Sequence, residues 1–411
     1  MSSNQHFVIV GGGLAGAKLA EALRANDFDG QVTLLAAEDD LPYERPPLSK
    51  QHLAGDQQLP DFTVDSPAWY RDHHIDLRLG TTVEAFDPAA RTVSLPDGST
   101  LSYDKLALAT GSRPRTLDVP GAEASNVYTL RTIGDSDRLL EVLRSKHRLV
   151  IVGAGWIGLE VAAQARARQV EVTVLEAAEL PLVSVLGPQM GTVFAELHRG
   201  NGVDLRTGVV VDMILTEDGV ATGVQLDDGQ VVPADAVLVA VGAQPNIEIA
   251  EAAGLATGTG ILVDESLRTS DPDVVAVGDI AEELHPLLGK RVRVEHWANA
   301  LNQPAVAALT MLGKPATYDR LPYFFTDQYN LGMEYTGYVG RDDDVRVVVR
   351  GDVAKPEFVA FWLDRDNRVR AGMNVNVWDV GERIEALIRS RKVVSPEMLA
   401  DVSVPLGEIA E

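Results

Sequence analysis

The stretch that decides the fold is LVIVGAGWIGLEVAAQARARQVEVTVLE, residues Leu149–Glu176. It opens with an apolar run, Leu149–Val152, which is typical of a strand buried on both faces. A G-x-G-x-x-G motif follows, and the pattern then predicts a helix from Ile157 to Arg168. A second strand is expected at Val170–Leu175. The stretch therefore predicts a strand–helix–strand unit with a glycine-rich first turn.

The glycines of this motif suit a bound dinucleotide. Gly153 permits a tight turn, Gly155 lets the backbone approach a pyrophosphate, and Gly158 lets the helix pack closely on the strand. The helix N-terminus offers free N–H groups to phosphates. Glu176 can accept both ribose hydroxyls of an adenosine and would repel a 2′-phosphate, and no Arg follows it in EAAELPL. The motif favours NADH over NADPH; a glycine-tolerant turn without a ligand is the alternative.

A second fingerprint stands near the start of the chain. The strand expected at Phe7–Val10 runs into GGGLAGAKLAEALRAN, in which Gly11, Gly13 and Gly16 have the same spacing. The acid that follows is Glu38, which lies beyond the end of the next predicted strand rather than at it. The ribose contact is accordingly less certain in this copy.

The two fingerprints belong to an internal repeat. Thr92–Pro114 and Gly223–Asn246 each read as a strand, a D-G turn, a second strand, an apolar strand, and a Gly followed by Pro. The later glycine is Gly111 in the first copy and Gly242 in the second. The sequence thus predicts two copies of one dinucleotide-binding unit.

The first copy is longer because it contains LPYERPPLSK, residues 41–50. Its adjacent prolines, Pro46 and Pro47, should hold Arg45 and Lys50 on a stiff loop at the ligand edge of the sheet. A surface loop with solvated charges is the alternative.

Composition narrows the function classes. A chain of 411 residues should form two or three domains, and 45% hydrophobic with 23% charged residues is ordinary for a globular protein. We expect neither a signal peptide nor a spanning helix. A net charge of −24 disfavours nucleic acid and anionic membranes. With no cysteine, disulfide and thiol chemistry are excluded, so redox chemistry would belong to a bound cofactor.

Two dinucleotide sites, one of which favours NADH, suggest that the other holds a resident flavin. Further signals are spread over the chain: Gly11–Gly16, Ala109–Gly111, Gly153–Glu160, Val274–Asp279 (VVAVGD), RPPLSK at 45–50, GLE at 158–160, EHWANA at 295–300 and PYFFTDQY at 322–329. These segments resemble the two-dinucleotide-binding flavoprotein reductases, and in particular the NADH-dependent ferredoxin reductases of oxygenase systems.

The resemblance implies an α/β fold with two Rossmann-like dinucleotide-binding domains. The FAD-binding domain would be discontinuous, formed by residues 1–111 and 244–320, around an NAD-binding domain at 112–243. A C-terminal α+β domain would occupy 321–411. The implied activity is that of a cytoplasmic NADH:ferredoxin oxidoreductase, which passes electrons from NADH through FAD to a [2Fe-2S] ferredoxin that supplies a monooxygenase or dioxygenase. No metal is expected.

The resemblance also implies residue roles. Lys50 would lie near flavin N5, Glu160 would line the nicotinamide pocket and pair with Lys50, and Trp297 would sit against the isoalloxazine. Asp279 would accept a hydrogen bond from the ribitol, and Arg131 would reach the flavin phosphates. The other residues placed at FAD or NADH are Gly11, Gly13, Gly16, Glu38, Arg45, Val83, Ala109, Thr110, Gly111, Gly153, Gly155, Ile157, Gly158, Glu176, Gly242, Glu295 and His296.

One position departs from the family. Pro304 stands where a glycine is usual, and we expect it in the first turn of a helix at Pro304–Leu312. Three rivals stay open: a reductase that serves rubredoxin or an NADH oxidase, an NADH-sensing flavoprotein resembling apoptosis-inducing factor, and a nicotinamide protein without flavin. The missing cysteine disfavours the oxidase.

Overall fold

The computed structural model describes residues 4–145 and 148–409, which fall into two compact units. Unit 1 consists of Met1–Arg45, Leu59–Arg113 and Gln244–Pro322. Unit 2 consists of Pro46–Gln58, Pro114–Ala243 and Tyr323–Glu411. The three-domain division expected from the resemblance stays a prediction.

Unit 1 is built on a parallel five-stranded sheet with strand order β19-β7-β1-β2-β3. These strands are β1 (His6–Val10), β2 (Gln31–Leu35), β3 (Ile75–Arg78), β7 (Lys105–Leu108) and β19 (Val274–Ala276). Their nearly continuous apolar sequence fits burial on both faces. The helices of this unit are α1 (Leu14–Ala25), α3 (Pro67–Asp72), α7 (Glu248–Ala252) and α8 (Trp297–Met311), and α1 packs along α8.

Smaller elements complete unit 1. The sheet β4-β5-β6 consists of Ala85–Asp87, Thr92–Ser94 and Thr100–Ser102, and the sheet β18-β20-β21 consists of Ile261–Val263, Ala281–His285 and Lys290–Val292. Two 3-10 turns are η2 (Leu59–Asp61) and η3 (Gly278–Ile280). Short strands β8 (Ser112–Pro114) and β17 (Ala243–Pro245) stand where the chain passes between units.

Unit 2 repeats the parallel sheet, with order β12-β11-β10-β16-β9. The strands are β9 (Val127–Tyr128), β10 (Leu149–Val152), β11 (Val172–Glu176), β12 (Asp204–Thr207) and β16 (Ala236–Val239). The remaining elements of this half are η1 (Pro46–Ser49), α2 (Gln51–Ala54), α4 (Ile133–Arg144), α5 (Trp156–Ala167), α6 (Val183–Gly200), β13 (Val211–Glu217), β14 (Val220–Leu226) and β15 (Val231–Pro233).

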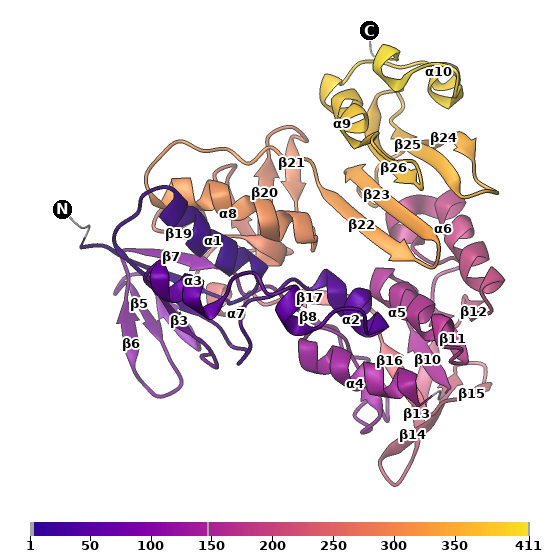
Figure 1. The fold of residues 1–411 in the computed structure, drawn as a ribbon, viewed down its shortest axis with the longest axis horizontal. Helices are drawn as coiled ribbons and strands as arrows, with labels where there is room; N and C mark the ends of the chain where they lie inside the picture. The colour runs from indigo at the N-terminus through magenta and orange to yellow at the C-terminus, as the bar shows by residue number, and fades with distance from the viewer. Residues whose placement is uncertain (1–3, 146–147, 410–411) are drawn as a thin grey trace. The chain divides into compact units, whose positions relative to one another are not determined.

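The C-terminal part of unit 2 is an antiparallel sheet, orange to yellow in Figure 1, with order β22-β23-β26-β25-β24. Its strands are β22 (Tyr323–Gln328), β23 (Leu331–Gly337), β24 (Arg346–Asp352), β25 (Glu357–Leu363) and β26 (Val369–Val375). Helix α9 (Gly381–Ser390) packs on β23 and β26, and α10 (Pro396–Ala400) and η4 (Leu406–Glu408) follow it. Strand β22 packs against α5, so this sheet contributes to the surroundings of the second glycine motif.

The predicted repeat is present. In each copy the glycine motif joins the central strand to a helix, and a three-stranded antiparallel meander precedes the strand on the other side of the centre. Strand β19, which follows the second copy in sequence, pairs with β7 and completes the sheet of unit 1. The predicted fold class, two Rossmann-like domains plus a C-terminal α+β domain, is confirmed. Within residues 4–145 and 148–409, no helix is long and apolar enough to cross a membrane.

Candidate functional site

The first glycine of each motif lies where no side chain fits. Gly11 has φ +117° and Gly153 has φ +104°. A Cβ on Gly11 would lie 2.1 Å from the Ala109 carbonyl oxygen, and one on Gly153 would lie 2.4 Å from the Ala240 carbonyl oxygen. The backbone of the neighbouring parallel strand therefore passes directly behind each turn, so both positions require glycine.

The other two glycines of each motif serve different purposes: the last allows close packing, and the middle one leaves space for a ligand. A Cβ on Gly16 would meet the Gly11 carbonyl oxygen at 2.0 Å, and one on Gly158 would meet the Gly153 carbonyl oxygen at 2.3 Å. By contrast, a Cβ on Gly13 or Gly155 would have no non-neighbouring atom of the described chain within 4 Å. Both are N-cap residues without a side chain to cap the helix, so α1 and α5 present backbone N–H groups to open space. The two turns fit the phosphates of a dinucleotide.

The acids after the two motifs have different partners. Glu176 ends β11, and its carboxylate accepts the backbone N–H groups of Ala154, at 2.7 Å, and Ala178, at 2.8 Å. It thus lies directly beside the glycine turn, where a ribose is expected. Glu38 instead accepts the Tyr43 hydroxyl at 2.6 Å and forms an ion pair of 2.7 Å with Arg45. In the first copy, two side chains from the insertion at residues 41–50 therefore contact the acid, Glu38.

The predicted ribitol ligand Asp279 lies in a tight turn of unit 1. Its carboxylate accepts the Ser112 hydroxyl at 2.6 Å. The preceding Gly278 has φ +76°, donates its N–H to Gln303 Oε1 at 2.7 Å, and would bring a Cβ within 3.3 Å of Ala15 Cβ. The structure therefore places this turn against the first turn of α1, next to the first glycine motif.

The turn Ala109–Gly111 borders the same loop. The Thr110 hydroxyl donates to the Asn246 carbonyl at 2.6 Å, and Gly111 has φ +63°. Val83 lies between β3 and β4, half-buried against the core of unit 1. The backbone of Ala109 and Thr110 lies directly behind Gly11, so this turn borders the first glycine motif.

Trp297 begins α8, with His296 as its N-cap. The indole N–H of Trp297 donates to a Glu44 carboxylate oxygen at 3.0 Å, and Glu295 forms an ion pair of 2.7 Å with Arg293. Burial removes water from His296 and lowers the pKa of its ring to about 4, although the negative charge of Asp279 acts in the opposite direction. His296 is thus neutral at physiological pH.

The expected place of Pro304 is wrong. Helix α8 begins at Trp297, so Pro304 lies inside the helix and is buried. Its missing N–H leaves the carbonyl of Ala300 without the usual helical donor. The Gln303 side chain next to it is fully buried and links the Gly278 turn to Glu283, whose carboxylate it contacts at 2.9 Å. Burial raises the pKa of Glu283 to about 8.

The segment that carries Lys50 is helical, contrary to the stiff loop expected from its prolines. Pro46–Ser49 form the 3-10 turn η1, and Lys50 is the N-cap of α2. The Ser136 hydroxyl of α4 donates to the Leu48 carbonyl at 2.7 Å. Adjacent prolines suit this turn because their fixed φ is close to that of a 3-10 helix.

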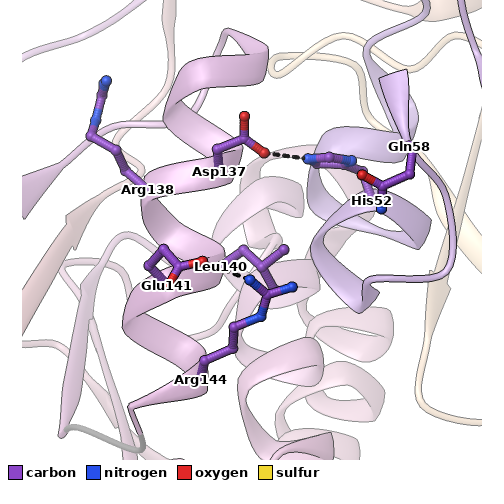
Figure 2. Close-up of a pocket in the computed structure, with 7 residues that line it drawn as sticks. All are labelled: His52, Gln58, Asp137, Arg138, Leu140, Glu141 and Arg144. Carbon is purple, nitrogen blue, oxygen red and sulfur yellow. Dashed lines mark hydrogen bonds and ion pairs between the residues drawn. The ribbon is translucent and has the colours of Figure 1, made fainter. Parts of the chain in front are cut away.

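A second contact between this segment and α4 involves His52 of α2, as Figure 2 shows. His52, itself buried, lies 2.9 Å from an Asp137 oxygen on α4. This contact borders a surface pocket of about 310 Å³, lined by His52, Gln58, Asp137, Arg138, Leu140, Glu141 and Arg144. The pocket contains none of the motif residues, and its cations stand beside acids, so we assign it no dinucleotide.

The expected ion pair between Lys50 and Glu160 is present. Lys50 Nζ lies 2.8 Å from Glu160 Oε1, and the residues are 6% and 4% exposed. The Ser49 hydroxyl donates to Glu160 Oε2, and the Thr326 hydroxyl donates to Oε1 at 2.6 Å. Lys50 also lies over the Phe325 ring, 5.5 Å from its centroid. A buried ion pair is tolerated when additional hydrogen bonds satisfy the carboxylate, as they do here.

Three further predicted residues lie in unit 2. Ile157 stands in the first turn of α5 and is 44% exposed beside the open glycine. Gly242 has φ +106° and accepts the Arg115 N–H at 2.9 Å through its carbonyl. Arg131 precedes α4, where its backbone N–H donates to the Asp135 carboxylate at 2.9 Å. A contact of Arg131 with flavin phosphates stays a prediction.

The sequence interpretation missed several contacts. Ser49 and Thr326 hold Glu160, Ser112 holds Asp279, and Glu44 receives the Trp297 indole N–H. Ser49 and Thr326 stand within motifs that carried the resemblance, and Glu44 and Ser112 stand directly beside such motifs, which is the one signal that could have found them. Among the described residues, no group of three or more His, Cys, Asp or Glu side chains could hold a metal ion.

Comparison with known proteins gives the same result over the whole chain. The model of the pyridine nucleotide-disulphide oxidoreductase family matches residues 5–303, and a reductase C-terminal domain matches 323–410. Putidaredoxin reductase of Pseudomonas putida is 39% identical, over 100% of this chain and 97% of that protein. The ferredoxin–NAD⁺ reductase component of the anthranilate 1,2-dioxygenase system of Burkholderia cepacia is 41% identical, over 97% and 98%.

Solved structures agree with these relatives. The crystal structure of the covalent putidaredoxin reductase–putidaredoxin complex contains a chain with a TM-score of 0.94 and 38% identity, covering 99% of this chain and 98% of that one. The ferredoxin reductase for the CYP199A2 system of Rhodopseudomonas palustris has a TM-score of 0.94 at 36% identity, covering 99% and 100%. The resemblance seen in the sequence is therefore confirmed. The chain is an oxidoreductase that belongs to the pyridine nucleotide-disulphide oxidoreductase family.

Proposed function

We propose that this protein is an NADH-dependent ferredoxin reductase, with resident FAD, that supplies electrons to a [2Fe-2S] ferredoxin of a monooxygenase or dioxygenase system. The observation that carries the proposal is the pair of glycine turns with matching backbone geometry and different acids. Two such turns need two dinucleotides. Relatives that match over nearly their whole length are named as ferredoxin–NAD⁺ reductase components of dioxygenase systems.

The turn of unit 1 binds FAD in this proposal. Gly11, Gly13 and Gly16 admit the pyrophosphate at the N-terminus of α1, and Asp279 supplies an acceptor for the ribitol. When bound, FAD supplies the conversion between a two-electron hydride donor and a one-electron acceptor.

The turn of unit 2 binds NADH. Gly155 leaves room for the pyrophosphate at the N-terminus of α5, and Glu176 accepts the ribose hydroxyls. Its negative charge disfavours the 2′-phosphate of NADPH. Glu160 lies one turn along the same helix, so its carboxylate is held near the expected nicotinamide, and Lys50 balances its charge. Contacts of Lys50 and Trp297 with the flavin belong to the same proposal.

Two basic clusters stand out in the acidic sequence, Lys290-Arg291-Arg293 and Arg389-Arg391-Lys392. Arg293 pairs with Glu295, and Arg389 pairs with Glu385, so part of each positive charge is already neutralised. A cytoplasmic location is part of the proposal because the donor NADH is a cytoplasmic metabolite, and cell fractionation tests it.

Anaerobic stopped-flow absorbance tests the proposal. The purified yellow protein is mixed with NADH and then with an oxidised [2Fe-2S] ferredoxin, and NADPH replaces NADH in the control. We expect fast bleaching with NADH, slow bleaching with NADPH, and rapid reduction of the ferredoxin. Electrons that pass only to oxygen would indicate an oxidase, and reduction of rubredoxin alone would change the partner. A long-lived long-wavelength band without onward transfer would indicate a sensor, and a colourless protein would remove the flavin.

A further inference from the structure

A line of buried polar side chains in unit 2 leads away from Glu160 and has no role in the proposed reaction. Thr326 lies 2.6 Å from Glu160, Gln328 lies 3.2 Å from Thr326, and His198 lies 2.8 Å from Gln328. Tyr329 ends the line, with its hydroxyl 3.2 Å from His198 Nδ1. The His198 side chain is 0% exposed, and burying a polar ring costs free energy unless it is hydrogen-bonded, so its hydrogen bonds need an explanation.

The periodicity of the elements builds this line. Thr326 and Gln328 alternate along β22 and share one face of the strand, and both are buried. His198 lies one turn after Phe194 on α6, and Glu160 lies one turn after Trp156 on α5. The Trp156 ring contacts the rings of Phe194, at 5.5 Å, and Phe324, at 4.9 Å. The aromatic layer therefore holds the two helices and β22 together, and the polar line forms the next layer.

The direction of the first hydrogen bond follows from Glu160. Its carboxylate is paired with Lys50 and can only accept hydrogen bonds. Thr326 must therefore donate its hydroxyl hydrogen to Glu160. Having used its one hydrogen, the Thr326 oxygen can only accept from Gln328, so the Gln328 NH₂ group faces Thr326.

The remaining bonds follow in turn. Because the Gln328 NH₂ group faces Thr326, its Oε1 faces His198 Nε2 and must accept. His198 therefore carries its hydrogen on Nε2, which leaves Nδ1 as an acceptor for the Tyr329 hydroxyl. Burial lowers the pKa of His198 to about 4, which keeps the ring neutral. Every donor in the line points towards Glu160.

We propose that Thr326, Gln328 and His198 are positioning residues, which hold the Glu160 carboxylate against Lys50 through a one-directional series of hydrogen bonds. Aligned hydrogen bonds polarise one another, so each one strengthens the bond to the carboxylate. The series fixes both the place of Glu160 and its acceptor-only state while the nicotinamide ring binds and leaves. This inference rests on the proposed function, since it assigns Glu160 to the nicotinamide pocket.

The first test reads the His198 tautomer directly and needs no turnover. Imidazole nitrogen chemical shifts are measured on histidine-labelled FAD-loaded protein between pH 5.5 and about 8, and His198→Phe assigns the signal. We expect a neutral ring with hydrogen on Nε2 throughout. A hydrogen on Nδ1, or a ring that becomes charged within this range, would reverse a bond of the series and overturn the proposal.

The second test compares variants by stopped-flow reduction with NADH. Thr326→Val keeps the shape and removes the donor to Glu160, and we expect a limiting rate of flavin reduction about tenfold lower with the NADH Kd changed less than about twofold. Thr326→Ser restores a hydroxyl and should recover most of the rate. Trp362→Phe is the matched control, because it removes a buried hydrogen bond from the Trp362 indole to the Leu186 carbonyl without touching the series.

The outcomes separate this inference from the proposed function. Equal rates for Thr326→Val and wild type, or an equal loss in Trp362→Phe, would overturn the positioning role while NADH still reduces the flavin. If NADH fails to reduce the wild type, the proposed function fails, and with it the role, whereas the nitrogen shifts still decide the order of donors. Should Thr326→Val not fold, His198→Phe with the same readouts takes its place, with a smaller loss expected.

Discussion

The two glycine turns of this protein share the same backbone features, yet their surroundings differ. Gly11 donates its N–H to the Leu35 carbonyl at 2.9 Å, and Gly153 donates to the Leu175 carbonyl at 2.8 Å. What differs is the acid: Glu38 contacts the side chains of Tyr43 and Arg45, whereas Glu176 accepts the backbone N–H groups of Ala154, in the glycine turn, and Ala178. The comparison teaches that the turn defines the ligand class, and that the residues around it distinguish a resident cofactor from one that exchanges.

The largest effect is expected from the first glycine of each turn. Gly11→Ala and Gly153→Ala each force a Cβ into a backbone carbonyl, at 2.1 and 2.4 Å, so the turn must move by more than a ligand tolerates. Gly11→Ala should yield protein without bound flavin. Gly153→Ala should keep its flavin and bind NADH at least about 100-fold more weakly. Flavin content and NADH titration measure the two effects; loss of flavin in both variants would remove the distinction between the turns.

A second difference concerns pH. The pKa of Glu283 in unit 1 is raised from 4.5 to about 8, so the folded protein binds a proton that the unfolded chain releases. The free energy of unfolding therefore falls because of this group as pH rises from 4.5 to 8. The decrease is at most on the order of 1.4 kcal/mol per pH unit. The pKa of His198 in unit 2 is lowered from 6.5 to about 4, so its contribution is lost as pH falls through that range.

Denaturant unfolding at acid and alkaline pH tests this contrast. Glu283→Gln should gain stability relative to wild type at pH about 8 more than at pH about 5, and His198→Phe should show the opposite trend. If the difference in unfolding free energy between each variant and wild type does not change with pH, the stated pKa shifts of Glu283 and His198 are contradicted.

A smaller effect is expected from the acids. Glu176→Ala should weaken NADH by about tenfold and reduce the preference over NADPH, because the ribose acceptor and its repulsion of a 2′-phosphate are both lost. Glu38→Ala is the matched variant, since it should weaken flavin retention by removing the carboxylate that forms an ion pair with Arg45, and leave NADH affinity unchanged. Unaltered NADH affinity in Glu176→Ala would show that Glu176 does not contact the ribose.

The parts of the fold that local sequence determines were predictable. Apolar strands, the glycine spacing and the D-G turns predicted both repeats, because each pattern reports on residues close in sequence. The start of α8 was not predictable in this way. His296 is an N-cap whose side chain does not cap the helix by a hydrogen bond, whereas proline is common in the first turn of helices, so the sequence pattern placed the start of the helix at Pro304.

The site was only partly predictable for a related reason. The Lys50–Glu160 pair followed from the resemblance, but its supporting donors did not. Glu160 and Thr326 are 166 residues apart, and their contact depends on how β22 packs against α5. No local pattern reports such a contact. The same holds for His198, which is brought to Gln328 from 130 residues away.

The most direct test of the two-ligand account uses the middle glycines, because Gly13→Ala and Gly155→Ala meet no non-neighbouring atom of the described chain within 4 Å and so leave the fold intact. Flavin content and NADH affinity are measured on both purified variants. The account predicts that Gly13→Ala loses FAD, and that Gly155→Ala keeps FAD but binds NADH at least about tenfold more weakly. Full NADH affinity in Gly155→Ala, with FAD retained in Gly13→Ala, would contradict it.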